Sequence, residues 1–351
     1  MLNKFLGKFS KSLGIDLGTA NTLVYVSGRG IVINEPSIVA VNNRTDKIIA
    51  IGEQAKKMFG RTPPHIIVTR PLIGGIISDF EATEKMLHFF IDKVHQEGFT
   101  LLPRPRVVIG VPLGITEVER KAVEDSAVSA GAREVYLVDE AMAAALGARL
   151  PINEAIGNLV VDLGGGTTEI AVISLEGIVT YRTLQIAGDK LNRDIIQYAE
   201  EEFNILLGET MAEDAKIKIG SALPTKNKAE MTIRGRDLIT GLPKEITVSE
   251  DQIREAIMKS LKIIAEEIKS TIEITPPELV ADIYQRGIIL CGGGAMLRGL
   301  DYFISEAVKI PVYVADDPLT CVVRGTGIIL EDKHLLDSLM SINRNIFTKI
   351  K

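Results

Sequence analysis

The sequence predicts an α/β protein with a duplicated core, because one pattern occurs twice along the chain. Residues 14–26 read GIDLGTANTLVYV, and residues 160–173 read VVDLGGGTTEIAVI. The Asp-Leu-Gly of the two segments coincides when they are aligned on Asp16 and Asp162. Each copy ends one β-rich run and opens another. We therefore expect two related α/β halves.

Each copy has the composition of a strand, a tight glycine turn and a returning strand. Glycine lets backbone N–H groups approach a ligand closely, so such a turn can bind phosphate. An aspartate directly before the turn is suited to the water shell of Mg²⁺. Each copy alone is equally compatible with an ordinary hairpin, but two copies and a third glycine cluster favour a nucleotide clamp. Neither copy fits a P-loop or opens a helix as a dinucleotide fingerprint must.

Composition limits the classes of function. The chain has 351 residues, 46% of them apolar and 25% charged, as expected of globular domains. Its net charge of −6 argues against a general nucleic-acid binder. Two cysteines without a secretory signal indicate a reducing cytosol, and neither they nor the four histidines have metal-ligand spacing. No apolar run reaches the roughly 18 residues of a spanning helix.

Residues 1–11 form an amphipathic pattern. Leu2, Phe5, Leu6 and Phe9 share one helical face, and the charged residues of the segment are all lysines. We expect an anchor for an anionic membrane surface. The alternative is a terminal helix that packs on its own domain.

Residues 98–106 form a second unusual segment, which displays Phe99, Leu101 and Leu102 beside prolines and arginines. Large apolar residues in such a loop indicate a second membrane contact. The alternative is that these side chains fold back onto the core.

Between the two repeats, the pattern predicts a helix over residues 80–95, a strand over 107–111 and a helix that starts after a capping box at Thr116 and Glu119. A strand over 135–138 leads into a helix with Asp139 as N-cap. Glu140 then lies at the carboxyl end of a strand, where it can orient or deprotonate a water. The structural alternative is that Glu140 only complements the helix dipole.

The second half carries an insert over residues 181–246. It contains a helical segment with Glu213 and Lys216, and a strand-like block in which Gly235, Gly241 and Pro243 are expected to form turns. A capping box at residues 249–252 opens a long amphipathic helix. Residues 288–297 predict a strand, a glycine loop and a helix, whose side-chain-free backbone can lie against a base or ribose. Asp317 and Pro318 are expected to cap a further helix.

The chain has a phosphate-binding hairpin, a helix that starts with Glu140, a second hairpin and a glycine loop, in that order. The same order is found in the actin superfamily of ATPases. Over essentially its whole length the chain resembles that superfamily. Four motifs are similar to its bacterial rod-shape members: DLGTANT at residues 16–22, NEPS at 34–37, DLGGGTTE at 162–169 and DPLTC at 317–321.

The resemblance implies an actin-like ATPase fold of two related α/β domains, each with a smaller subdomain, and a nucleotide in the cleft between them. The first domain would comprise residues 1–32, 66–145 and 315–351, with subdomain 33–65. The second would comprise residues 146–180 and 247–314, with subdomain 181–246.

The resemblance also implies ATP and Mg²⁺ as cofactors. Asp16 and Asp162 would hold the metal through water, and Glu140 with Thr167 would position the attacking water. Conventional actin has a lysine in its first hairpin where this chain has Asn21 and Thr22, which implies slow turnover. The implied nucleotide contacts are Thr19, Ala20, Asn21, Gly164, Gly165, Gly166, Ala212, Glu213, Asp214, Ala215, Lys216, Gly292, Gly293, Gly294 and Ala295.

By resemblance, the chain is expected to be a slow Mg-dependent ATPase whose nucleotide state controls filament assembly, at the inner face of the cell membrane. Its expected partners are other copies of itself in paired protofilaments, the anionic membrane surface, cell-wall elongation proteins and membrane adaptors, with no nucleic acid. The alternative is a soluble ATPase or sugar kinase of the same fold. It is less favoured because the sequence shows no polar sugar pocket or peptide-binding domain.

Overall fold

The computed structural model describes residues 11–96, 104–226 and 228–348. The predicted membrane segment at residues 1–10 and the loop residues Phe99, Leu101 and Leu102 lie outside them. The chain divides into two compact units. Unit 1 comprises residues 1–156, 173–178 and 319–351, and unit 2 comprises residues 157–172 and 179–318.

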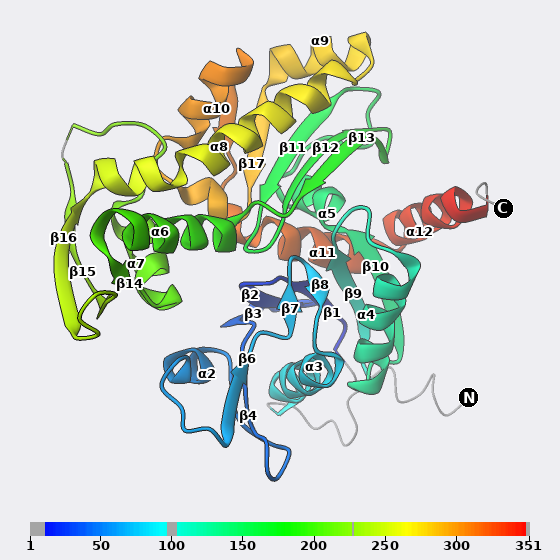
Figure 1. Cartoon of the computed structure of the whole chain (residues 1–351). Helices are drawn as coiled ribbons and strands as arrows, with labels where there is room; N and C mark the ends of the chain where they lie inside the picture. The colour runs from blue at the N-terminus through cyan, green and yellow to red at the C-terminus, as the bar shows by residue number, and fades with distance from the viewer. Residues whose placement is uncertain (1–10, 97–103, 227, 349–351) are drawn as a thin grey trace. The chain divides into compact units, whose positions relative to one another are not determined.

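A five-stranded mixed sheet forms the centre of unit 1 (Figure 1). β1 pairs antiparallel with β2 and parallel with β9, and β9 pairs parallel with β10. The central strands are apolar and buried, as expected for strands covered on both faces. In spatial order the strands are β10 (Glu134–Asp139), β9 (Arg106–Val111), β1 (Leu13–Leu17), β2 (Asn21–Val26) and β3 (Gly30–Pro36).

The second sheet repeats this strand order. A hairpin lies at its centre. A third strand extends the sheet next to the second strand of the hairpin, and two strands parallel to the first strand of the hairpin extend it on the other side. The duplicated α/β core predicted from the repeated Asp-Leu-Gly motif is therefore confirmed. The strands in order are β13 (Gly177–Leu184), β12 (Thr168–Ser174), β11 (Asn158–Leu163), β17 (Ile288–Cys291) and β18 (Val312–Val314).

The helix predicted after the capping box at Thr116 forms where that signal places it, and a helix forms over the predicted residues 80–95. The Thr116 hydroxyl and Glu119 form the expected capping box, and the Asp79 carboxylate accepts a hydrogen bond from the Ala82 N–H. Their apolar stripes pack in one core with the sheet, including Phe90 and Val123. The helices of this unit are α3 (Phe80–His95), α4 (Glu117–Ser129), α5 (Glu140–Gly147), α11 (Cys321–Glu331) and α12 (Lys333–Thr348).

Helices α5 and α11 approach each other more closely than side chains would allow. A Cβ on Gly325 would overlap the Ala143 carbonyl, and a Cβ on Gly147 would overlap the Cys321 carbonyl. The same helix α11 packs on the first hairpin, since a Cβ on Gly14 would lie 2.6 Å from the Thr326 hydroxyl. Glycine therefore permits direct backbone packing that fixes α5, and with it Glu140, on the sheet.

Unit 1 also carries a small subdomain with its own core of Ile38, Ala40, Ala50 and Ala55. Its three-stranded sheet has the order β5-β4-β6, and β7 pairs with β8 as a separate hairpin. The elements are β4 (Val39–Asn42), β5 (Lys47–Ile51), α2 (Glu53–Met58), β6 (Ile66–Thr69), β7 (Leu72–Ile73) and β8 (Ile76–Ile77).

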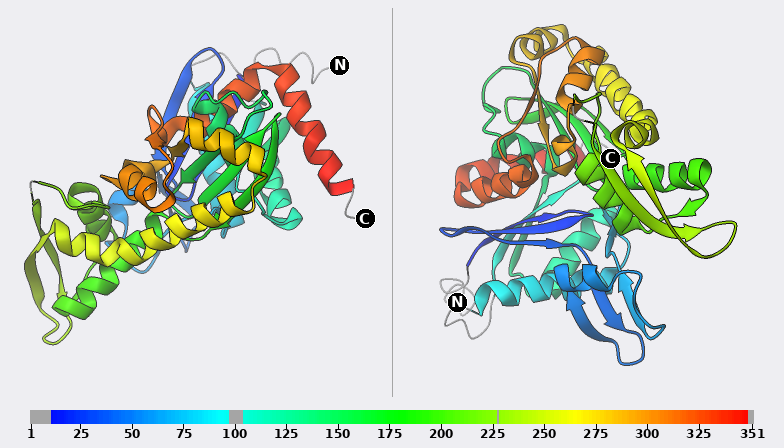
Figure 2. Two further views of the ribbon diagram at one scale, coloured as in Figure 1. Left: turned by 90° about the horizontal axis from the view of Figure 1, so that it is seen from above. Right: turned by 90° about the vertical axis from the view of Figure 1, so that its left-hand side faces the viewer.

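In unit 2, the long helix α8 connects the inserted strands to the rest of the unit. Its buried stripe of Ile253, Ile257, Leu261, Ile264 and Ile268 is the one that the sequence predicts. Strands β15 and β16 lie at the opposite end of α8 from α9 (Figures 1 and 2). The remaining elements are α6 (Gly188–Phe203), β14 (Ile205–Leu206), α7 (Glu209–Ile219), β15 (Glu230–Asp237), β16 (Pro243–Ser249), α8 (Glu250–Glu273), α9 (Pro277–Arg286), the 3₁₀ helix η1 (Gly293–Met296), α10 (Leu300–Val308) and the 3₁₀ helix η2 (Pro318–Thr320).

Several local predictions about turns and helix caps are wrong. Pro243 does not form a turn but is the first residue of β16, where it pairs with Arg236 of β15. Gly235 does not form a turn but lies inside β15, where a Cβ would overlap the Leu206 carbonyl, so the glycine permits close approach of β14. Asp317 does not cap an α-helix, because Pro318 opens the 3₁₀ helix η2 and α11 starts only at Cys321. None of the helices among the described residues is long and apolar enough to span a bilayer.

We expect Gly325→Ala to destabilise unit 1 by about 2 kcal/mol. Alanine favours an isolated helix by about 1 kcal/mol, but overpacking against rigid backbone costs about 1 to 3 kcal/mol or more. Urea denaturation of the full chain measures the change. Gly177→Ala is the matched control, because its Cβ would be 3.6 Å from the nearest atom. Equal stability of the two variants would contradict the close packing of α5 and α11.

Candidate functional site

In unit 1, three parallel strands bring the predicted polar residues to one sheet edge. Asp16 near the end of β1 is in register with Gly110 of β9, and Gly110 is in register with Val138 of β10. Glu140 follows β10 directly and is buried, with 8% of its surface exposed. A Cβ on Gly110 would lie 3.2 Å from the Glu140 Cγ, so the glycine makes room for that side chain. Asp16 and Glu140 thus occupy the carboxyl edge of the unit 1 sheet, as the sequence predicts.

The turn of the first hairpin is held by two neighbouring segments. The Ser37 hydroxyl donates to the Gly18 carbonyl at 2.6 Å, and the Ser37 N–H donates to the Ala20 carbonyl at 3.0 Å. The Thr19 hydroxyl accepts from the Gly75 N–H at 2.9 Å. Sequence reasoning missed Ser37 and Gly75 as residues that fix this turn. Ser37 belongs to the NEPS motif at residues 34–37, which could have indicated its role. Nothing in the sequence around Gly75 indicates a contact with Thr19.

Asp139 is the N-cap residue of α5 by position, but its side chain makes no capping hydrogen bond. Its carboxylate lies 3.5 Å from the Arg120 guanidinium of α4. Burial raises the pKa of Asp139, and the attraction of Arg120 opposes that rise. The predicted cap is therefore replaced by an ion pair, which links α4 to the start of the helix that carries Glu140.

In unit 2, the second hairpin forms a tight turn braced by the start of α6. The Gly164 N–H donates to the Thr167 carbonyl at 2.9 Å, and the Asp189 N–H donates to the Gly165 carbonyl at 2.8 Å. The Gly188 N–H also donates to the Gly164 carbonyl at 3.2 Å. The predicted residues Gly164, Gly165 and Thr167 thus share one braced turn.

Helix α7 reaches this turn through Lys216. The Lys216 ammonium donates to the Gly188 carbonyl at 2.9 Å. Ala212 and Ala215 are buried in the core of unit 2, and the Asp214 carboxylate lies 3.5 Å from the Lys218 ammonium. Lys216 therefore binds the start of α6, which in turn holds the second hairpin. The expected contacts of these residues with a ribose or adenine stay predictions.

The third glycine segment packs directly on the second hairpin. Gly292 has a φ of +79°, and a Cβ there would lie 2.5 Å from the Asp162 Oδ1. A Cβ on Gly294 would lie 2.7 Å from the Leu163 Cβ. The Gly292 N–H donates to the Pro318 carbonyl at 2.8 Å. These contacts bring the residues Gly292–Ala295 and the strand end at Asp162 together, as the sequence predicts for one ligand site.

Asp162 is the most unusual electrostatic group of this site. Its surface is 6% exposed and its Oδ1 has no hydrogen-bond partner. Burial raises the pKa of Asp162 to about 7. A buried carboxylate is costly unless a cation or its water shell compensates it. Among the described residues no group of three or more His, Cys, Asp or Glu could form a protein cage, whereas Mg²⁺ needs few protein ligands.

Residues 10–338 match the family model described as MreB/Mbl protein. The chain belongs to this family. It is 51% identical over 342 residues to the cell shape-determining protein MreB of Escherichia coli K12, covering 95% of this chain and 98% of the relative. It is 48% identical over 328 residues to the cell shape-determining protein Mbl of Bacillus subtilis 168, covering 93% of this chain and 98% of the relative.

The fold of the MreB/Mbl chain is also that of solved actin-like structures. The crystal structure of MreB5 of Spiroplasma citri bound to ADP matches with a TM-score of 0.86 and 40% identity, over 91% of this chain and 96% of that one. The MamK double helical filament matches with a TM-score of 0.78 and 22% identity, over 92% and 99%. The second likeness shows the fold alone. The actin-like fold predicted from the order of motifs is therefore confirmed.

We expect Asp162→Asn to stabilise the nucleotide-free protein at pH 8. Because burial raises the folded-state pKa above that of the unfolded chain, ionisation of Asp162 removes stability as the pH rises towards and through about 7. Asparagine has no charge to desolvate, so the gain is on the order of 1 kcal/mol or more at pH 8 and smaller at pH 5. Thermal unfolding at both pH values measures it. Lower stability of the variant at pH 8 would contradict an uncompensated carboxylate.

Proposed function

We propose that the chain is an ATP-dependent, membrane-associated cytoskeletal protein that forms actin-like filaments, organises cell-wall synthesis and maintains rod cell shape. The observation that carries this proposal is the 51% identity, over nearly both full lengths, with a protein named for determining cell shape. The alternative of a sugar kinase or soluble ATPase has no such support among the relatives.

ATP is the proposed nucleotide. Two crystal structures of MreB5 of Spiroplasma citri, one bound to ADP and one to AMPPNP, match this chain at 40% and 39% identity. In unit 2, the glycine turn at Gly164–Gly166 follows the strand that ends with Asp162 and Leu163, and Gly292 lies directly against the Asp162 carboxylate. Such glycine segments suit phosphates and a nucleoside. The other proposed contacts are Thr19, Ala20, Asn21, Ala212, Glu213, Asp214, Ala215 and Lys216.

Mg²⁺ is the proposed metal, held through water by Asp16 and Asp162. The unpartnered Oδ1 of Asp162 fits this role, because a hydrated cation supplies both charge and hydrogen-bond donors. Bound Mg²⁺ would neutralise phosphate charge. That contribution matters in a chain with Asn21 and Thr22 where conventional actin has a lysine.

For hydrolysis we propose that Glu140 and Thr167 orient the attacking water. Glu140 starts α5, at the carboxyl edge of the unit 1 sheet, and the α5–α11 packing fixes that helix. A carboxylate in this place can accept a proton from water, as general bases do. Thr167 is the residue after the glycine turn, and its carbonyl accepts the hydrogen bond from the Gly164 N–H that closes the turn. Slow hydrolysis would let the nucleotide state time filament assembly.

The membrane is the proposed location, at the cytoplasmic face. The Lys11 N–H donates to the His95 Nε2 at 3.3 Å, and the Lys11 ammonium donates to the Val94 carbonyl at 3.5 Å. The point where residues 1–10 join the fold therefore lies beside the end of α3, and α3 ends at His95, three residues before the segment 98–106 that contains Phe99. This proximity supports the proposal that both apolar segments serve one membrane contact. Further proposed partners are other copies of the chain in paired protofilaments, cell-wall elongation proteins and membrane adaptors.

Sedimentation of purified protein with ATP, ADP or no nucleotide tests the proposed function. Filaments that pellet with ATP, and that electron microscopy finds on anionic lipid, are the expected result. Protein that phosphorylates a sugar and stays in the supernatant would favour the sugar kinase.

We expect Glu140→Ala to bind ATP nearly as well as the wild type but to release phosphate about 10² to 10⁴ times more slowly, the usual contribution of a general base. Phosphate release and nucleotide affinity are measured on the same preparations. Glu134→Ala is the control, since Glu134 starts β10, the strand that leads into Glu140, and pairs with the Arg106 guanidinium at 2.9 Å. Unchanged hydrolysis in Glu140→Ala would remove Glu140 from the mechanism.

Removal of residues 1–11 is expected to weaken lipid binding without stopping assembly. Each lysine near an anionic surface contributes roughly 1 kcal/mol, so one copy binds weakly, whereas a filament gains about 10² to 10⁴ in avidity. Liposome flotation of full-length and truncated protein, as filaments and as monomers, measures both effects. Equal flotation of the two proteins would show that residues 1–11 are not the anchor.

A further inference from the structure

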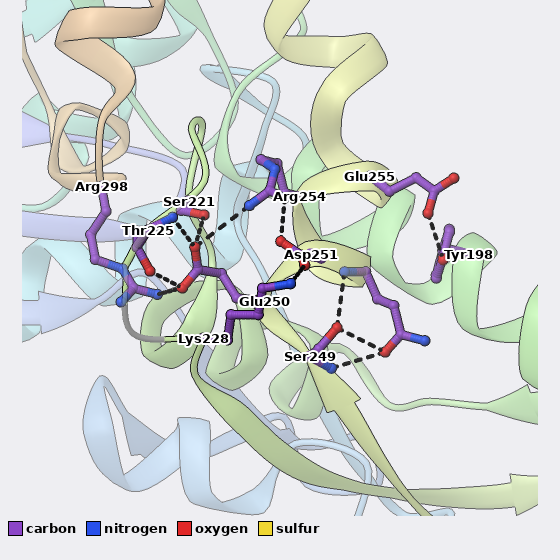
Figure 3. A network of polar contacts seen from close by, with 11 residues as sticks. Tyr198, Ser221, Thr225, Lys228, Ser249, Glu250, Asp251, Arg254, Glu255 and Arg298 are labelled. Carbon is purple, nitrogen blue, oxygen red and sulfur yellow. Dashed lines mark hydrogen bonds and ion pairs between the residues drawn. The ribbon is translucent and has the colours of Figure 1, made fainter.

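A buried carboxylate at the start of α8 connects two of the proposed nucleoside-binding segments. Glu250 is 1% exposed, although it is the first residue of a helix that follows an exposed hairpin. Figure 3 shows its carboxylate enclosed by polar groups from three parts of unit 2. A charge is rarely buried so completely without a structural reason.

The first partners of Glu250 come from the segment that follows α7. The Ser221 hydroxyl donates to Oε1 at 2.9 Å, and the Thr225 hydroxyl donates to Oε2 at 2.6 Å. The Thr225 N–H also donates to Oε1 at 3.1 Å. Burial alone would raise the pKa of Glu250, but these hydrogen bonds hold it below its ordinary value. The carboxylate is therefore a fixed negative charge that holds residues 221–225 in place.

The second partner comes from the segment that follows η1. The Arg298 guanidinium lies 4.0 Å from the Glu250 carboxylate and donates through Nε to the Gly220 carbonyl at 3.0 Å. The Arg298 carbonyl accepts from the Ala222 N–H at 2.8 Å. Residues 220–222 and Arg298 thus form a short parallel bridge, which joins the end of α7 to the end of η1.

Both bridged elements carry proposed nucleoside contacts, Glu213 and Lys216 on α7 and Gly293–Ala295 in η1. The bridge fixes the spacing of their ends, and a Cβ on Gly220 would already lie 3.2 Å from the Leu297 Cδ1. Glu250 completes the bridge from a third element, and Arg254 adds a further cation 3.5 Å from its carboxylate. A shift in any of these partners would therefore change the distance between α7 and η1.

We propose that Glu250, together with Thr225 and Arg298, is a positioning residue that sets the spacing of α7 and η1 and so determines the affinity and selectivity for the nucleoside of ATP. The inference rests on the proposed function, since it assigns the nucleoside to these two elements. Glu250 does not contact the nucleotide in this assignment. Its effect on phosphate binding is accordingly small.

The test measures the affinity of the full chain for ATP, GTP and inorganic tripolyphosphate by competition with a fluorescent ATP analogue. Glu250→Gln keeps the shape of the side chain and removes its charge. Thr225→Val removes the hydroxyl that donates to Oε2, and Thr225→Ser restores it. Glu245→Gln is the matched control, because that carboxylate pairs with Arg234 on the exposed face of the β15–β16 hairpin.

Glu250→Gln and Thr225→Val are expected to weaken ATP binding between about fivefold and about 150-fold, the usual range of coupling between sites. Both should lower the preference for ATP over GTP and leave tripolyphosphate binding unchanged. Thr225→Ser and Glu245→Gln should behave as the wild type.

Unchanged ATP affinity and ATP-over-GTP preference in both variants would overturn the assignment. Equal losses for ATP and tripolyphosphate would also overturn it, because they would indicate general damage to the fold. If Glu250→Gln fails to fold, the ATP affinity and ATP-over-GTP preference of Thr225→Val and Thr225→Ser decide between the proposal and its rejection. A wild-type chain that binds no ATP would instead overturn the proposed function.

Discussion

Direct packing of backbone on backbone at glycine positions is the constraint on which the rest of this structure depends. In unit 1, Gly147 and Gly325 let α5 and α11 cross without intervening side chains, and this crossing fixes the helix that carries Glu140. In unit 2, Gly292 and Gly294 let the loop after β17 lie directly on the end of β11. Any larger residue at these positions would separate the elements that carry the candidate functional groups.

Three buried or half-buried carboxylates of the two units have different surroundings. Asp139 lies beside Arg120 at the start of α5. Glu250 receives hydrogen bonds from two hydroxyls and one backbone N–H and has two guanidinium groups nearby. The Oδ1 of Asp162 has no hydrogen-bond partner. Since desolvation is costly for each, the first two carboxylates are compensated within the protein, and a hydrated metal ion is the proposed compensation of the third. This contrast distinguishes structural carboxylates from the one proposed to face a metal.

Hydrogen bonds to the backbone hold the glycine segments of the candidate site in unit 2 in place. The turn at Gly164–Gly166 is held by the start of α6, and Lys216 in turn binds the Gly188 carbonyl. The loop at Gly292 is held by the Pro318 carbonyl. A site whose backbone is braced in this way pays little ordering entropy when it binds. The structure therefore supports preorganised binding in unit 2.

The sequence by itself determined the duplicated core, the hairpins at Asp16 and Asp162, and the boundaries of α3, α4 and α5 together with the start of α8. These features depend on local signals, namely the repeated motif, the apolar periodicity and the capping boxes at Thr116 and Ser249. The sequence also placed Glu140 at the carboxyl end of a strand, because a helix that directly follows a parallel strand starts at that end. The roles assigned to the individual site residues stay predictions.

Only the tertiary structure decided which distant groups compensate one another. No pattern in the sequence pairs Glu250 with Thr225 and Arg298, or Thr19 with Gly75, since these contacts join segments that are separated along the chain. The same holds for Gly235, which reads as a turn residue but serves close strand packing. Glycine is required both for positive φ and for close approach, and the sequence cannot distinguish these two requirements. The fold distinguishes them because it alone shows what a Cβ at each position would meet.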